Sequence, residues 1–405
     1  MHIPSEEVFR HIIVEPSGIW FVPTIGADAH AILVKLPSNV LKSIIKGCKV
    51  SFGFSLNNMR SGTVLMTVVY VYDDLSTPVI AIGPLIDREQ QIALVEILRD
   101  RQSTPIFFYD ELARNVAEAR CLFANQTEEI IKLIGDVDRL YAGEANKDVK
   151  VALDQLESDA EAIISENTLR TEHVFAIEIT LRNFVEFNLH VIGNREKSQF
   201  KITHPNEGDT LEQSVWHLLM DLFQNNLYRS PQVIEGRTRR ELTDILAISE
   251  YGIFIFESKS LSILNNVKEQ STARRAKNIE AHIRKALNQL LGATKAIHNG
   301  LEIYASDGQR IDFNRNIPPH GIVLISEMFH VVDWNAMFLE FAQATIKSKV
   351  ILHILDLREL ARLVGGSKTV NIFDYNLLER SKQVIEHRNL LVRVNFIKDK
   401  SEIEH

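Results

Sequence analysis

The pattern of apolar and polar positions divides the chain into three parts. In the first part, residues 1–125, β-branched and aromatic runs bounded by turn residues are typical of strands. These runs lie at residues 18–22, 31–36, 49–54 and 63–71. Near the end of this part, helical spacing of apolar residues predicts helices over 87–100 and 109–123. We therefore expect a strand-rich α+β domain that acts as a sensor, a substrate clamp or an oligomerisation module.

The second part, residues 126–195, is acidic and helix-prone. Residues 126–167 contain 11 acidic and 4 basic side chains, a local balance of −7 in a chain of net charge −8. Two interpretations stay open, a solvated helical connector between domains and an acidic arm that mimics nucleic acid. The dense apolar content of residues 171–191 predicts one more helix, packed in an interface within the chain or between chains.

The third part, residues 196–400, has the pattern of an α/β domain. Helical spacing predicts a helix over 210–227 that starts at the capping residues Asp209 and Thr210, and a short strand is expected near Val233. Further on, the pattern predicts helices over 272–298, 330–345 and 374–386 and buried strands over 321–326 and 350–355.

The most informative segment of this third part lies between the strand near Val233 and the long helix. Two apolar runs, 245–248 and 253–256, flank the turn candidate 249–252, which predicts a β-hairpin with both faces buried. Asp244 begins the first strand, and Glu257 and Lys259 end the second. Antiparallel pairing would bring all three charged residues to the open end of the hairpin, with Glu257 and Lys259 on one face.

Two carboxylates at the edge of an apolar sheet repel each other and resist desolvation unless a cation lies between them. Oxygen ligands of this kind suit magnesium or manganese better than zinc. A bound metal polarises a phosphoryl oxygen and activates water, and a neighbouring ammonium orients that water or balances the charge on phosphate. These are the parts that phosphodiester hydrolysis needs.

An acid-bearing helix followed by Asp244, a hairpin and Glu257-Ser258-Lys259 resembles the motif of the PD-(D/E)XK nuclease superfamily, and especially its nuclease-related domain (NERD) branch. The resemblance implies metal binding by Asp244, Glu257, the Ser258 carbonyl and the helical acid Glu212, with Lys259 beside the attacking water. Glu207, on the approach to the same helix, is the alternative to Glu212. Gln289, in the following helix, is the candidate for a further polar catalytic residue.

The resemblance further implies a restriction-endonuclease-like αβββαβ core and a Mg²⁺- or Mn²⁺-dependent nuclease that acts on DNA, with RNA possible. Thr243 stands where the family name has proline. The segment ILHILDLRELARLV is similar to the Shedu-type group of antiphage nucleases. An alternative from another class is a catalytically silent protein that binds nucleic acid or a partner. Retention of Asp244, Glu257 and Lys259 together favours activity.

Charge in the long helix bears on the substrate. Residues 268–295 contain seven basic and two acidic side chains, a balance of +5. Positive charge beside the predicted site suits a phosphate backbone, although a solvated face is the other interpretation. The candidate nucleic-acid-binding residues are Arg274, Arg275, Lys277, Arg284 and Lys285.

Composition and the N-terminal segment bear on location. The two cysteines, Cys48 and Cys121, lie far apart and form no CxxC pair, which suits a reducing cytoplasm. The chain lacks the pattern of a signal peptide and an apolar run of the roughly 20 residues that a membrane helix needs. We expect a cytoplasmic protein without membrane attachment, and a homo-oligomer assembled through the N-terminal or connector region.

Overall fold

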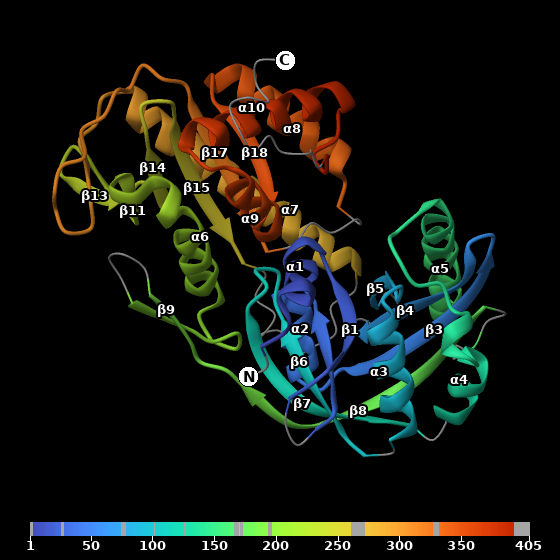
Figure 1. The fold of residues 1–405 in the computed structure, drawn as a ribbon. Helices are drawn as coiled ribbons and strands as arrows, with labels where there is room; N and C mark the ends of the chain where they lie inside the picture. Colours follow the sequence, from blue (N-terminus) through green and yellow to red (C-terminus); the bar gives the residue numbers. More distant parts are fainter. Residues whose placement is uncertain are drawn as a thin grey trace. The chain divides into compact units, whose positions relative to one another are not determined.

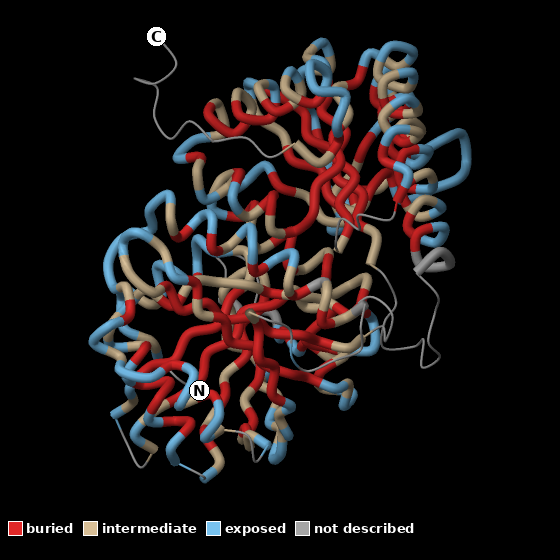
Figure 2. The backbone as a smooth tube through the Cα atoms, turned by 90° about the vertical axis from the view of Figure 1, so that its right-hand side faces the viewer, coloured by how far each residue is buried: buried red, intermediate tan, exposed pale blue. Residues whose placement is uncertain are grey.

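The computed structural model describes residues 3–25, 28–73, 78–100, 102–124, 127–165, 170, 173–192, 197–260, 272–326 and 332–392. The chain forms two compact units, Met1–Leu189 and His190–His405 (Figure 1). In both units the buried positions are concentrated in the sheet strands, whereas the helices alternate buried and exposed positions (Figure 2). The class is therefore mixed α/β, as the sequence predicts.

The first unit is built on a mixed eight-stranded sheet of order β1-β2-β6-β7-β8-β3-β4-β5. Neighbouring strands are antiparallel except β2 and β6, which are parallel. The strands are β1 Gly18–Pro23, β2 His30–Lys35, β3 Lys49–Met59, β4 Gly62–Tyr72, β5 Val79–Pro84, β6 Thr104–Tyr109, β7 Asn115–Phe123 and β8 Val174–Glu186. The four strands expected in this region, at 18–22, 31–36, 49–54 and 63–71, are confirmed as β1 to β4.

The helices in the described part of the first unit are α1 Glu6–Val14, α2 Ser38–Ile45, α3 Arg88–Arg99, α4 Thr127–Ile134 and α5 Lys147–Ser165. A short 3-10 turn, η1, spans Val137–Arg139. The acidic helix α5 buries Leu156 and Ala160 against Val68 of β4 and Val174 of β8. The acidic segment thus forms helices, as expected, but α5 packs on the first sheet and does not stand apart as a connector between domains.

Two predicted helices are strands in the structure. Residues 115–123, expected as part of a helix over 109–123, form β7, where Ala117, Ala119 and Cys121 are buried and alternate with Glu118 and Arg120. Residues 174–186, expected within a helix over 171–191, form β8 between β7 and β3. Its first four residues are buried because a central strand is covered on both faces. Dense apolar content therefore reflected a strand that is buried in its first four residues and partly exposed in the rest.

The second unit is built on a five-stranded sheet of order β11-β14-β15-β17-β18. β11 and β14, and β14 and β15, pair antiparallel, whereas β15, β17 and β18 are parallel. The strands are β11 Leu227–Arg229, β14 Ile245–Ile248, β15 Ile253–Lys259, β17 Pro319–Ile325 and β18 Ile351–Asp356. The predicted hairpin and the strands expected over 321–326 and 350–355 are confirmed.

Three further strands form a small sheet of order β13-β12-β16. These strands are β12 Gln232–Glu235, β13 Thr238–Glu241 and β16 Ile303–Tyr304. The strand expected near Val233 is therefore present, but it belongs to this small sheet, and the first strand of the five-stranded sheet is β11. A separate two-stranded ribbon joins β9 Leu189–Ile192 and β10 Lys197–Phe200.

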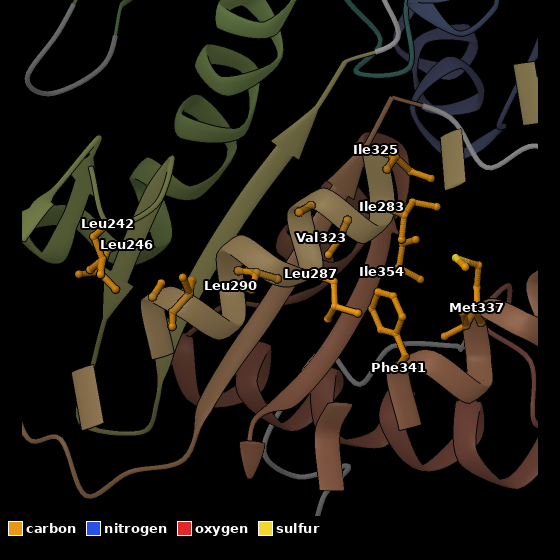
Figure 3. Packing of buried hydrophobic residues seen from close by; sticks show 14 of the residues in the cluster. Leu242, Leu246, Ile283, Leu287, Leu290, Val323, Ile325, Met337, Phe341 and Ile354 are labelled. Atoms are coloured by element: carbon orange, nitrogen blue, oxygen red, sulfur yellow. The ribbon is translucent and has the colours of Figure 1, made fainter. Parts of the chain in front are cut away.

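The helices of the second unit cover both faces of its five-stranded sheet. They are α6 Glu207–Phe223, α7 Thr272–His298, α8 Trp334–Ser348, α9 Leu357–Gly366 and α10 Val370–His387, with a 3-10 turn, η2, at Gln224–Asn226. On one face α7 packs Ile283, Leu287 and Leu290 against Leu246, Val323 and Ile354, with Met337 and Phe341 of α8 alongside (Figure 3). On the other face Phe223 of α6 and Phe373 of α10 pack against Phe254. Among the described helices, none has the length and apolar character to cross a membrane.

Candidate active site

The two candidate carboxylates lie opposite each other because of the register of the hairpin. Ile245 pairs with Phe256 and Leu246 with Ile255, so the next position outward places Asp244 across from Glu257. Leu246 and Ile255 pack against α7, and side chains two residues apart share a face. Asp244 and Glu257 therefore both point to the α7 side of the sheet, an arrangement in which like charges repel.

Two hydrogen bonds fix the open end of the hairpin. The Ser258 backbone N–H donates to Asp244 Oδ2 at 2.6 Å, and the Thr243 hydroxyl donates to the Phe256 carbonyl at 2.7 Å. The N–H and C=O of a strand residue point to the same neighbouring strand, so the Ser258 carbonyl faces the Asp244 side of β15. Thr243, directly before Asp244, thus supplies a cross-strand bond.

Lys259 lies between the two carboxylates. Its Nζ is 3.1 Å from Glu257 Oε2 and 3.9 Å from Asp244 Oδ2. The side chains of Lys259 and Asp244 are each 14% exposed and that of Glu257 is 1% exposed, so solvent screens these charges weakly. One ammonium group therefore serves two nearly buried carboxylates.

The third candidate carboxylate, Glu212, comes from α6. Burial, and next the charge of Asp244, raise the pKa of Glu212 to about 7, against the opposing effect of Arg229. Glu212 Oε2 lies 3.9 Å from Arg229 Nη2, and the same guanidinium group forms an ion pair with Asp209. The alternative, Glu207, is buried in the first turn of α6. Of the two candidates, Glu212 is therefore the one whose pKa responds to the charge of Asp244.

The hairpin carboxyls share the raised pKa. Burial, followed by the charge of Asp244, raises the pKa of Glu257 to about 7, although Lys259 opposes this. Burial also raises the pKa of Asp244, with Lys259 as the main opposing influence. The positive charge at the site is thus insufficient to keep all three carboxyls in their ordinary titration range.

A cavity of about 290 Å³ opens beside Asp244 and Glu257. One wall is the end of the small-sheet strand β13 and the residues after it, and the other wall is α7. The lining residues are Arg240, Glu241, Leu242, Thr243, Asp244, Glu257, Asn288, Gln289 and Gly292. Gln289 therefore reaches the same cavity as the two carboxylates.

Sequence reasoning missed Arg240, Glu241 and Asn288, and it took His282 as a packed or surface residue. Asn288 is the neighbour of Gln289 in α7, and Glu241 lies three residues before Asp244. The pKa of His282 is lowered by burial and then by the charges of Lys259 and Lys285, so this imidazole favours its neutral form. A search for polar residues one or two helical turns from Gln289 would have identified His282.

The donor set fits a hard divalent cation in type and charge. Asp244, Glu257, Glu212 and the Ser258 carbonyl offer oxygen donors only, which suits Mg²⁺ or Mn²⁺. A cation beside them would lower the raised pKa of the carboxyls. Within the described residues, however, no three acidic, histidine or cysteine side chains converge as a ready-made metal site.

The predicted nucleic-acid-binding residues of α7 fall into three groups. Lys277 and Lys285 are exposed. Arg284 bonds Glu280 at 3.2 Å and Glu340 at 3.0 Å, so it ties α7 to α8 and its charge is already balanced. The side chains of Arg274 and Arg275 lie outside the described residues. Lys277 and Lys285 are therefore the described residues of this set that present charge to solvent.

Comparisons of the chain with protein-family models, curated proteins and solved structures found no match.

Proposed function

We propose that this protein is a Mg²⁺- or Mn²⁺-dependent nuclease that hydrolyses phosphodiester bonds in DNA. The observation that carries the proposal is the pair Asp244 and Glu257, held across from each other with Lys259 between them and a cavity alongside. Nearly buried carboxylates with a raised pKa are costly for stability, and such groups concentrate at functional sites. A cation is the simplest partner that offsets their repulsion.

The order of elements supports the same proposal. Helix α6 is followed by β11, β14 and β15, then by α7 and the parallel strand β17. This order agrees with the αβββαβ core of the PD-(D/E)XK nucleases, with β12 and β13 inserted between the first two strands. The site lies at the open end of the β14–β15 hairpin, where the family motif would place it.

Each residue of the site has a role that follows from its chemistry. Asp244, Glu257 and the Ser258 carbonyl would hold the metal, and Glu212 would assist. When bound, the metal supplies Lewis-acid polarisation of the phosphate and a lowered pKa for water. Lys259, with three N–H donors, orients the attacking water and balances charge on the phosphate. Gln289 presents an amide to whatever occupies the cavity.

The proposal is tested by incubating the protein with supercoiled plasmid, linear duplex DNA and RNA in the presence of Mg²⁺, Mn²⁺ or a chelator. We expect metal-dependent cleavage of DNA that falls by roughly a thousandfold in Asp244→Asn and in Lys259→Ala, as when one transition-state-stabilising group is lost. Glu250→Gln is the matched control, because Glu250 is exposed at the opposite end of the same hairpin.

Equal cleavage by wild type and both site variants would assign any activity to a contaminant and refute the site. Calorimetric titration with Mg²⁺ accompanies the assay. Metal binding without cleavage of any substrate would favour a binding protein with a nuclease-like site. A place in antiphage defence rests on the Shedu-type resemblance, and it is tested by phage challenge of cells that express wild type or Lys259→Ala.

A further inference from the structure

The small sheet in front of the cavity carries exposed cations that the proposed chemistry does not use. In β13 all four residues are exposed, and the preceding turn is exposed as well. Arg240 is engaged, because its Nε bonds Glu235 at 3.3 Å and its Nη1 bonds the Glu241 carbonyl at 3.2 Å. Arg237 and Arg239 form no ion pair within the described part of the chain. Two guanidinium groups are therefore presented to solvent.

The turn geometry places Arg237 at the tip of this hairpin. Glu235 pairs with Thr238, which leaves Gly236 and Arg237 as a two-residue loop. Gly236 has a φ of 64°, and tight hairpin loops favour glycine at this first loop position. Arg237, at the second loop position, is exposed. Arg237 is therefore held at a defined place by a turn that most other sequences would not form.

The hairpin is anchored to the body of the unit. Val233 of β12, Leu242 after β13 and Ile303 of β16 are at most 3% exposed and belong to the same core as Ala296 and Ile297 of α7. Arg239 lies opposite Ile234, the neighbour of buried Val233, so it occupies the outward face. The cations thus stand on a fixed platform, which reduces the entropy lost when they bind a ligand.

The distance between the two arginines and the cavity suits a ligand that is a long polyanion. Arg237 precedes Asp244 by seven residues, so the chain between them spans at most about 25 Å. A duplex backbone advances about 3.4 Å per base pair, so both arginines fall within about seven base pairs of the cavity. The described lysines of α7 with solvent-exposed charge, Lys277 and Lys285, belong to the helix that forms the opposite wall.

We infer that the β12–β13 hairpin, residues 232–241, is a backbone-binding arm that grips the phosphates of duplex DNA through Arg237 and Arg239. This inference rests on the proposed function for its substrate. The hairpin contains no aromatic residue, whereas proteins that hold single strands stack bases on aromatic side chains. Its contacts go to phosphates and carry no sequence information. The arm therefore adds affinity and orientation without specificity for sequence.

The test compares the full chain with Arg237→Gln/Arg239→Gln by fluorescence anisotropy on a labelled duplex in chelator, where metal-dependent cleavage is absent. We expect the slope of log K against log salt to fall by about 2, close to 0.9 per lost phosphate contact, and affinity to fall roughly tenfold or more at 0.1 M salt. With Mg²⁺, KM for duplex DNA should rise while kcat stays unchanged, as expected when uniform binding is lost.

Lys347→Gln/Lys349→Gln is the matched control. It removes the same charge, both lysines are exposed, and they precede β18, whose start lies at the opposite sheet end from Lys259. The arm is refuted if the arginine variant binds duplex DNA like wild type or no more weakly than this control. It is also refuted if only single-stranded DNA or RNA binding is weakened.

The two proposals fail in different ways. If wild type cuts DNA and the arginine variant keeps full affinity, the arm is wrong and the nuclease stands. If wild type cuts nothing but loses duplex affinity on removal of the two arginines, the arm stands and the catalytic proposal fails.

Discussion

Two buried clusters of charge in the second unit are organised in opposite ways. Arg380 and Glu359 form a pair whose side chains are 1% and 2% exposed, with Nε to Oε1 at 2.7 Å. Arg380 Nη2 bonds the Ile354 and Leu390 carbonyls, each at 3.0 Å. In the candidate active site, by contrast, Lys259 is shared by Asp244 and Glu257. One cluster is balanced, and the other carries surplus negative charge beside a cavity.

This difference separates a structural ion pair from a functional one. A buried charge is tolerated when a partner of opposite sign and hydrogen bonds satisfy it, as in the Arg380 pair. The carboxylates at the hairpin end lack enough counter-charge, so their pKa rises and the folded state loses stability when they ionise. Residues that reduce stability in the isolated chain are the ones on which ligand binding can act.

The largest expected effect comes from breaking the balanced pair. Arg380→Met leaves Glu359 buried without its partner and should lower the free energy of unfolding by about 3 to 5 kcal/mol. Urea denaturation followed by the fluorescence of Trp216 and Trp334, which lie in the second unit, measures this. Lys382→Met, which removes an exposed lysine of the same helix paired with Glu379, should leave the free energy of unfolding nearly unchanged. Equal effects of the two variants would contradict the comparison.

Removing the charge of Glu257 should raise stability, the opposite of the effect of Arg380→Met. The folded pKa of Glu257 is about 7 against an ordinary 4.5, so ionising it costs roughly 3 kcal/mol, at about 1.4 kcal/mol per pH unit. This raised pKa makes the wild type lose stability as pH rises from 4.5 to 7. Glu257→Gln should therefore be more stable than wild type at pH 8 without metal, by up to about 3 kcal/mol, and the gain should vanish near pH 4.5.

The same urea titration, repeated across this pH range in chelator, measures the gain from Glu257→Gln. Glu250→Gln, at the exposed turn of the hairpin, serves as the control and should leave stability unchanged within about 0.5 kcal/mol. Saturating Mg²⁺ should cancel most of this gain, because the wild type alone is stabilised by about 2.7 kcal/mol when metal reaches 100 times its Kd. If Glu257→Gln is less stable than wild type at pH 8 without metal, the site carries no destabilising surplus of negative charge.

The smallest expected effect concerns His353, a buried histidine. His320 Nδ1 lies 3.0 Å from His353 Nε2, and His320 Nε2 lies 2.9 Å from Asp374 Oδ1. Burial, and next the charge of His320, hold the pKa of His353 well below 6.5. The unfolded chain binds a proton below pH 6.5 that folded His353 does not, so stability is lost as pH falls. Between pH 6.5 and 5.5 this loss is about 1 kcal/mol.

Thermal denaturation at several pH values tests this effect. His353→Gln should have a shallower fall in stability below pH 6.5 than wild type, whatever its absolute stability. Exposed His387→Gln should keep the wild-type slope. If both variants have the same slope, His353 is protonated in the folded protein.

The sequence was sufficient for elements whose pattern is local. The β14–β15 hairpin, α7 and the buried strands β17 and β18 were all predicted, because each is a long apolar run or a strong helical repeat. The strand β7 was mistaken for a helix because its buried positions, such as Ala117 and Ala119, are small. For β8, the partner β3 lies more than 100 residues earlier in the chain, and no local pattern reports such a pairing.

The site was predictable to the extent that one hairpin builds it. Asp244, Glu257 and Lys259 are close because residues that pair in a hairpin are near in sequence. Arg240, Glu241 and Asn288 were missed because they reach the cavity from the small sheet and from α7. The ion pairs of Arg284 were equally hidden, since Glu340 lies 56 residues away in α8. The site residues that could not be predicted are therefore those brought together by contacts between elements far apart in the sequence.

The turn formed by residues 249–252 takes no part in the proposed chemistry, yet it sets the register of the two strands on which the site depends. The Ser249 hydroxyl accepts hydrogen bonds from the Tyr251 and Gly252 N–H groups, and a Cβ on Gly252 would lie 2.8 Å from the Phe254 ring. One residue added here would slip the strands and send Glu257 to the other face, away from Asp244. Surface loops usually tolerate changes in length. The length of this loop sets the strand register, and the register places the carboxylates at the far end of the hairpin. Its length should therefore be as constrained as the identity of the carboxylates.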